Sequence, residues 1–110
     1  MTDNHTALDK TTLESDVVDA LKTIYDPEIP VNIYELGLIY GIEINDEADV
    51  TIKMTLTTPN CPVAQTFPQT VADKIRQIPM VADVYVEIVW DPPWTAEHMS
   101  EAARLTLGFL

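Results

Sequence analysis

Two stretches in which apolar and polar residues alternate constrain the fold of this chain most. The first covers residues 38–44, and the second covers 50–57, where Val50, Ile52, Met54 and Leu56 alternate with threonines and a lysine. Alternate side chains of a strand point to opposite faces, so both stretches predict strands with one buried face. The polar segment 45–49 between them predicts a turn, and the pair is therefore expected to form an antiparallel hairpin.

Patterns on either side of the hairpin predict the remaining helices and strand. They predict a helix over 11–24, a helix over 62–77, a strand over 84–90 and a helix over 95–107. Thr11 and Glu14 fit a capping box at the start of the first helix, and Pro68 is expected to interrupt the second one. A helix between the second and third strands allows these strands to pair in parallel by a right-handed crossover. The order helix, hairpin, helix, strand, helix predicts a small two-layer α+β domain with a three-stranded mixed sheet.

Length and composition limit the class of protein. The 110 residues suffice for one domain, expected over 11–110 behind a disordered leader at 1–10. The chain has no apolar run long enough for a membrane span and no export signal, so we expect a cytoplasmic protein. Six scattered basic residues against eighteen acidic ones give a net charge of −12, and nucleic acid is therefore not an expected partner. One cysteine allows no internal disulfide.

The cysteine lies in the sequence Thr57-Thr58-Pro59-Asn60-Cys61-Pro62, between the second strand and the second helix. If that helix begins at Pro62, the Cys61 thiol lies at a helix N-terminus, capped by Thr58 or Asn60, where the macrodipole favours the thiolate. A single cysteine is more often a small buried apolar residue. Its position between two prolines at a polar junction favours a functional thiol.

Other residues leave alternatives open. Metal binding by Cys61 requires a second ligand, either Cys61 of another copy in a homodimer or a carboxylate such as Asp26. Asp26 precedes a proline, where a structural turn is as good an interpretation as a functional one. His98 is expected to be exposed in a first helical turn, which leaves the thiol without a visible base. Trp90 is expected to close the core, whereas Trp94 is a candidate interaction surface.

Three longer motifs together resemble a known family. They are Asp-Pro-Glu-Ile-Pro-Val-Asn-Ile-Tyr-Glu-Leu-Gly-Leu-Ile-Tyr at 26–40, the cysteine sequence at 57–62, and Trp-Asp-Pro-Pro-Trp at 90–94 followed by Met-Ser-Glu-Ala-Ala-Arg-Leu at 99–105. In this order they resemble the metal-sulfur cluster biosynthetic family, which includes SufT, PaaD and eukaryotic cytosolic iron-sulfur assembly factors, with SufT the most similar. The resemblance covers about residues 12–108. It implies a two-layer fold that often self-associates, with Cys61 as the reactive cysteine and Asp26 as the acidic motif residue.

The resemblance favours an accessory factor for iron-sulfur cluster assembly that has no enzymatic turnover of its own. Cys61 would contact iron, a cluster or a client cysteine, supported by Asp26, Thr57, Thr58 and Asn60, with iron or a cluster bound transiently and no cofactor bound stably. The expected partners are the assembly machinery and its client proteins. One alternative is an interaction adaptor with an incidental cysteine, which uses Trp94 and the apolar tail. Another is a PaaD-like oxygenase maturation factor, although PaaD-like members carry further cysteines that this chain lacks.

Overall fold

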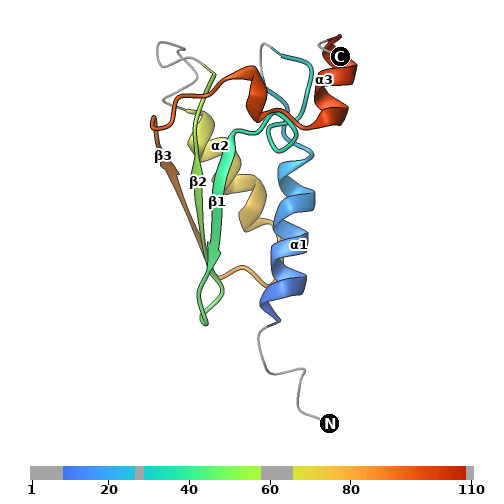
Figure 1. Ribbon diagram of the computed structural model, residues 1–110. Helices are drawn as coiled ribbons and strands as arrows, with labels where there is room; N and C mark the ends of the chain where they lie inside the picture. Colours follow the sequence, from blue (N-terminus) through green and yellow to red (C-terminus); the bar gives the residue numbers. More distant parts are fainter. Residues whose placement is uncertain (1–8, 27–28, 58–65, 109–110) are drawn as a thin grey trace.

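The computed structural model describes residues 9–26, 29–57 and 66–108, and the following statements concern these residues (Figure 1). Its elements are α1 (Lys10–Leu21), β1 (Ile39–Ile44), β2 (Asp49–Met54), α2 (Phe67–Arg76), β3 (Asp83–Ile88), the 3-10 helix η3 (Ala96–His98) and α3 (Glu101–Leu107). The predicted order of helix, hairpin, helix, strand and helix is confirmed.

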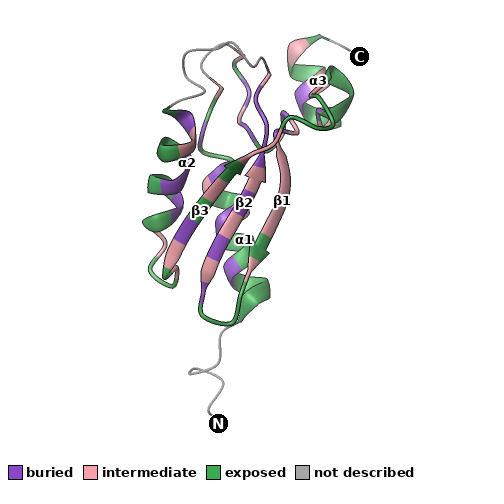
Figure 2. Cartoon of the chain, turned by 90° about the vertical axis from the view of Figure 1, so that its left-hand side faces the viewer, coloured by how far each residue is buried: buried purple, intermediate pink, exposed green. Residues whose placement is uncertain are grey.

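The sheet is mixed, as predicted. Its strand order is β1-β2-β3, with β1 antiparallel to β2 and β2 parallel to β3 from the pair Asp49 and Asp83 to the pair Met54 and Ile88. Helices α1 and α2 lie against the same face of the sheet, and within the described chain no helix covers the middle of the other face (Figures 1 and 2). The molecule is therefore a two-layer α+β domain.

The core lies between the sheet and these two helices. Strand β2 supplies Val50, Ile52 and Met54, none of which has any exposed surface, while the residues between them on the strand are partly exposed. Helices α1 and α2 add fully buried residues at helical spacing: Val17, Leu21, Val71 and Ile75. The alternation in the sequence thus correctly predicts the buried face of β2, whereas β1 has no fully buried residue and its pairing is irregular between Ile39 and Gly41.

Helix α1 is capped by a residue that the sequence pattern did not indicate. Asp9 is the N-cap, and its Oδ1 accepts hydrogen bonds from the backbone N–H groups of Thr11 and Thr12 at 3.1 and 3.2 Å. The prediction of a Thr11 capping box is therefore wrong, because a carboxylate two residues earlier meets the same free N–H groups. Residues 1–8, which make up most of the predicted leader, lie outside the described residues.

Helix α2 begins at Phe67, with Thr66 as its N-cap and Pro68 in its first turn. Pro68 therefore does not interrupt the described helix, because in the first turn its missing N–H has no intrahelical partner to lose. Residues 62–65, where the helix was predicted to begin, lie outside the described residues.

The predicted C-terminal helix is divided into two. Thr95 caps η3, and Ser100 caps α3, with Met99 extended between them at ψ 146°. The Ser100 N–H donates to the Glu35 carbonyl oxygen at 2.8 Å, a tertiary contact that takes this residue out of a continuous helix. Gly108 ends α3 in the left-handed conformation, which is typical of a glycine that follows a helix. Among the described helices, none has the length and apolar character needed to span a membrane.

Candidate functional site

The first and third sequence motifs meet at one end of the sheet, which we call the motif end, and β2 ends there between them. The Thr55 N–H donates to the Leu38 carbonyl oxygen at 2.8 Å, and the Val89 N–H donates to the Met54 carbonyl oxygen at 2.8 Å. These bonds extend the pairing of the three strands to the points where the chain enters or leaves the motifs. The segment that leads to Cys61 therefore leaves the sheet between the first motif and the third (Figure 1).

Asp26, at the start of the first motif, shapes a turn. Its Oδ1 accepts a hydrogen bond from the Ile29 N–H at 2.9 Å, and its own N–H donates to the Val31 carbonyl oxygen at 3.2 Å. Because this is typical turn chemistry for an aspartate before proline, the geometry supports the structural interpretation of Asp26. Its role beside Cys61 stays a prediction.

The rest of the first motif is fixed by buried apolar residues and by one required glycine. Ile33, Leu36 and Leu38 are fully buried. Gly37 has φ +81°, and a Cβ added there would lie 2.1 Å from the carbonyl oxygen of His98, which lies between the two parts of the third motif. The two motifs therefore approach so closely that only glycine fits at position 37.

Three hydrogen bonds fasten the third motif onto the first. The indole Nε1 of Trp94 donates to the Leu36 carbonyl oxygen at 2.8 Å, and the Tyr40 hydroxyl donates to the Pro92 carbonyl oxygen at 2.8 Å. The third is the bond from the Ser100 N–H to Glu35. Partial burial raises the pKa of Tyr40, with a smaller contribution from Asp91, so the phenol stays protonated as a donor. The Tyr40 ring also stacks on His98, with 5.6 Å between the ring centroids.

The structure changes the interpretation of the two tryptophans. Trp90 is 45% exposed, so the prediction that it closes the core is wrong. Trp94 is half-buried and packs against the core instead, because its ring lies over the first motif while the chain turns Trp90 outward. Only part of the Trp94 side chain is exposed to a partner, and its predicted role as an interaction surface stays a prediction. His98 is exposed, as expected.

Most of the predicted thiol site lies beyond the described residues. Thr58, Asn60 and Cys61 are outside them, and Thr57, half-buried, is the last described residue before the gap. The predicted location of Cys61 at a helix N-terminus is thus untested. Within the described part of the chain, no three His, Cys, Asp or Glu side chains gather closely enough to hold a metal ion.

Thr55 is a candidate residue that the sequence analysis missed. Its side chain is 1% exposed, and its Oγ1 has no hydrogen-bond partner among the described residues. Alternation placed this threonine on the polar outer face of β2, but Thr55 lies at the motif end, past the last residue of the strand. The signal available in the sequence was the run of threonines at 55, 57 and 58 that leads to Cys61.

Comparisons with known proteins agree with the motifs. Residues 14–88 match the family described as "Iron-sulfur cluster assembly protein". A "Fe-S protein maturation auxiliary factor" of Porphyromonas gingivalis is 46% identical over 88% of this chain and 92% of its own length. The "Fe-S protein maturation auxiliary factor SufT" of Staphylococcus aureus is 40% identical over 77% and 97%.

A solved structure confirms the fold. The crystal structure of a domain of unknown function from Bacillus anthracis superposes with a TM-score of 0.83 at 30% identity, covering 98% of this chain and all of that one. The family match extends over more than half of the chain, and it includes the first motif and the cysteine motif. This chain therefore belongs to the iron-sulfur cluster assembly protein family.

Proposed function

We propose that this protein is an accessory factor in the maturation of iron-sulfur proteins, acting through the Cys61 thiol. The observation that carries the proposal is the meeting of the first and third family motifs at one end of the sheet, where β2 and Thr57 lead into the cysteine motif. The relatives from Porphyromonas gingivalis and Staphylococcus aureus are both named Fe-S protein maturation auxiliary factors, which supports the proposal. The proposal includes action in the cytoplasm, without enzymatic turnover and without nucleic acid as a partner.

In this proposal, iron or a cluster is the cargo of the protein and not a resident cofactor. The Cys61 thiolate contacts the cargo or a client cysteine, since the thiolate is the form of cysteine that binds metal. Transient binding requires a second ligand, from another copy of the chain, from Asp26 or from a client. The partners are the assembly machinery and its client proteins. The described residues contribute the end of the sheet that precedes residues 58–65 and the helix α2 that follows them.

Replacement of the thiol tests the proposal. In cells that lack the native copy, Cys61→Ser is expected to reduce the activity of iron-sulfur enzymes to the level of the empty strain, while circular dichroism of the purified variant is unchanged. Thr51→Ser, on the open face of β2 away from the motif end, is the matched control and is expected to retain full activity. Full activity of Cys61→Ser would contradict the proposal.

A second candidate function is an adaptor that recruits the assembly machinery while its cysteine is incidental. Trp90 and Leu105, the exposed first and last residues of the third motif, favour this alternative, because exposed aromatic and aliphatic residues often anchor contacts between proteins. The pH dependence of Cys61 alkylation separates the two functions. A thiol with a pKa below the ordinary value of about 8.5 supports the first function, and an ordinary or raised pKa supports the adaptor.

A further inference from the structure

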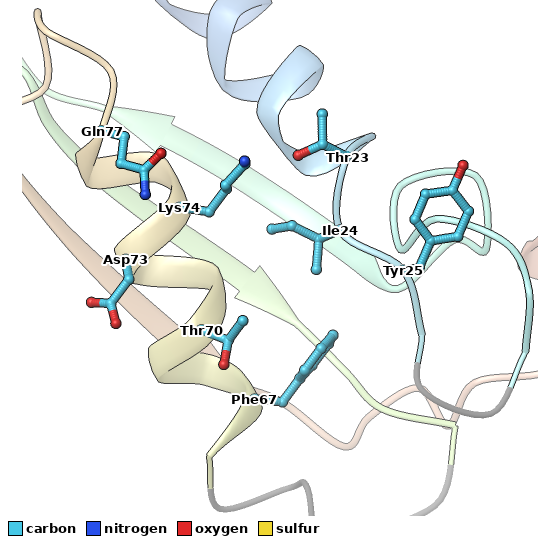
Figure 3. Close-up of a pocket in the computed structure, with 8 residues that line it drawn as sticks. All are labelled: Thr23, Ile24, Tyr25, Phe67, Thr70, Asp73, Lys74 and Gln77. Atoms are coloured by element: carbon cyan, nitrogen blue, oxygen red, sulfur yellow. The ribbon is translucent and has the colours of Figure 1, made fainter.

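A groove of about 500 Å³ lies between the C-terminal end of α1 and the outer side of α2 (Figure 3). At its base lie two apolar side chains, Ile24 and Phe67, each 8% exposed. Tyr25, 59% exposed, forms part of the wall beside α1, and Thr70 and Lys74 form part of the wall on α2. The groove is open and shallow, which suits one inserted side chain better than an enclosed cofactor.

Lys74 is the cation that distinguishes this groove. Each of the other five basic residues of the described chain has an acidic or carbonyl partner: Lys10 with Asp46, Lys22 with Glu35, Lys53 with Glu43, Arg76 with Asp73 and Asp83, and Arg104 with the Glu97 carbonyl oxygen. Lys74 forms no ion pair with any described residue and is exposed. In a chain of net charge −12, an unpaired ammonium group beside apolar side chains makes this groove a candidate site for a negatively charged occupant.

The neighbouring carboxylate does not cancel this charge inside the groove. Asp73 Oδ1 accepts hydrogen bonds from Gln69 Nε2 at 2.7 Å and from Arg76 Nη1 at 3.2 Å. Figure 3 shows the Asp73 carboxylate pointing away from α1, whereas the Lys74 side chain extends toward Thr23. Asp73 also lines the groove, but its carboxylate is held by Gln69 and Arg76, so the charge that extends over the groove toward α1 is that of Lys74.

We propose that this groove binds a peptide segment of a partner protein in which an apolar side chain is followed by an acidic one. The apolar side chain packs on Ile24 and Phe67, and the carboxylate pairs with Lys74. The identity of the partner as a client or an assembly protein rests on the proposed function. A nucleic acid does not fit, because binding it requires several cations along the phosphate backbone, and this groove has one lysine beside apolar side chains.

The groove lies close in the sequence to the first motif and to the cysteine motif. Tyr25 immediately precedes Asp26, and Phe67 follows Cys61 by six residues. A segment held here is bound by Tyr25, which adjoins the first motif, and by Phe67, which follows the end of the cysteine motif by five residues. The groove thus offers a way for a partner to be held by contacts other than those of the thiol itself.

Nuclear magnetic resonance titration of the full chain with short capped peptides tests the proposal. The probes are acetyl-Gly-Leu-Glu-Gly-amide and two controls, one with Leu-Gln and one with Ser-Glu at the central positions. The Leu-Glu peptide is expected to shift the amide resonances of Ile24, Phe67 and Lys74 at least fivefold more than either control at equal concentration. Equal shifts from all three peptides, or shifts spread over the whole surface, would overturn the proposal.

A charge reversal sharpens the test. Lys74→Glu is expected to abolish the preference for Leu-Glu and to create a preference for a Leu-Lys peptide. Lys53→Glu makes the same change of charge on the open face of β2 and is expected to leave the Leu-Glu preference intact. If Lys53→Glu acts as Lys74→Glu does, only net charge matters and the groove is not the site.

The outcome is separable from that of the proposed function. Full enzyme maturation by Cys61→Ser removes the proposed function and leaves the peptide preference standing. Loss of the peptide preference removes the groove proposal and leaves the alkylation behaviour of Cys61 standing.

Discussion

The two ends of the sheet are held together in different ways. At the motif end, Tyr40 and Trp94 donate to carbonyl oxygens of residues 52 and 58 positions away in the chain. At the opposite end, which we call the turn end, Asn45 Oδ1 accepts from the N–H groups of Glu47 and Asp49, both at 2.9 Å and both within four residues. The side-chain hydrogen bonds at the motif end thus join distant segments, whereas those of Asn45 at the turn end are local. The turn end is also joined to a distant segment by the backbone bond from the Ala82 N–H to the Ala48 carbonyl oxygen.

Exposure follows the same division. The turn end is joined to the start of α1 by the exposed ion pair of Lys10 and Asp46, an interaction of a kind that contributes little to stability. At the motif end, Leu36, Leu38 and Thr55 are buried or nearly so. We therefore expect substitutions at the motif end to change the free energy of unfolding most, because buried tertiary contacts cannot be replaced by water.

The largest expected effect is that of Gly37→Ala. The added Cβ would lie 2.1 Å from the His98 carbonyl oxygen, and the positive φ disfavours any L side chain, so we expect a loss of about 3 kcal/mol in the free energy of unfolding. Chemical denaturation measures it. Gly108→Ala is the matched control, since Gly108 has nearly the same φ, +82°, but open space around it. It is expected to lose about 1 kcal/mol, and equal losses for the two variants would contradict the close approach of the motifs.

A smaller loss is expected from Trp94→Phe. This change removes the indole N–H and leaves the Leu36 carbonyl oxygen without that donor, at an expected loss of about 2 kcal/mol by thermal or chemical denaturation. Trp90→Phe is the control at an exposed ring and is expected to remain within about 0.5 kcal/mol of the parent. If Trp90→Phe were the more damaging of the two, the assignment of Trp94 as the fastening residue would fail.

Thr55→Val tests the motif end in the opposite direction. Valine keeps the shape of threonine and removes a buried hydroxyl without a partner, so a gain of about 1 kcal/mol is expected. Thr51→Val, at a partly exposed position of β2, is the control and is expected to change stability by less than about 0.5 kcal/mol. A clear loss of stability in Thr55→Val would show that the hydroxyl has a partner in solution.

The smallest expected effect concerns the turn end and its dependence on pH. Hydrogen bonds from Thr12, and a weaker one from Thr11, lower the pKa of the Asp9 carboxyl below its ordinary value of 3.8. The contribution of this cap is therefore complete above the unfolded pKa and is lost as the pH falls through the lower folded pKa. Asp9→Asn is expected to show a weaker decline of stability in acid than the parent. If the free energy of unfolding of Asp9→Asn falls in acid as steeply as that of the parent, Asp9 does not contribute to the decline.

The elements were predictable where short-range patterns decide them. The alternation of Val50, Ile52 and Met54 identified a strand and its buried face, and the parallel pairing with β3 followed from the helix between them. Boundaries were less predictable. Asp9 replaced Thr11 as the cap of α1, and the C-terminal helix divides where Ser100 bonds to Glu35, a partner 65 residues earlier that no local pattern indicates.

For the candidate site, the sequence by itself determined which segments matter, because the motifs at 26–40, 57–62 and 90–105 mark the family without reference to their positions in space. Only the tertiary structure decided that the first and third motifs are fastened together, that Trp94 and not Trp90 packs inward, and that Thr55 loses contact with solvent. The physical reason is the sequence separation over which the deciding interactions act. Periodicity and capping depend on neighbours within a few residues, whereas burial and close approach depend on which distant segments the packed core brings together.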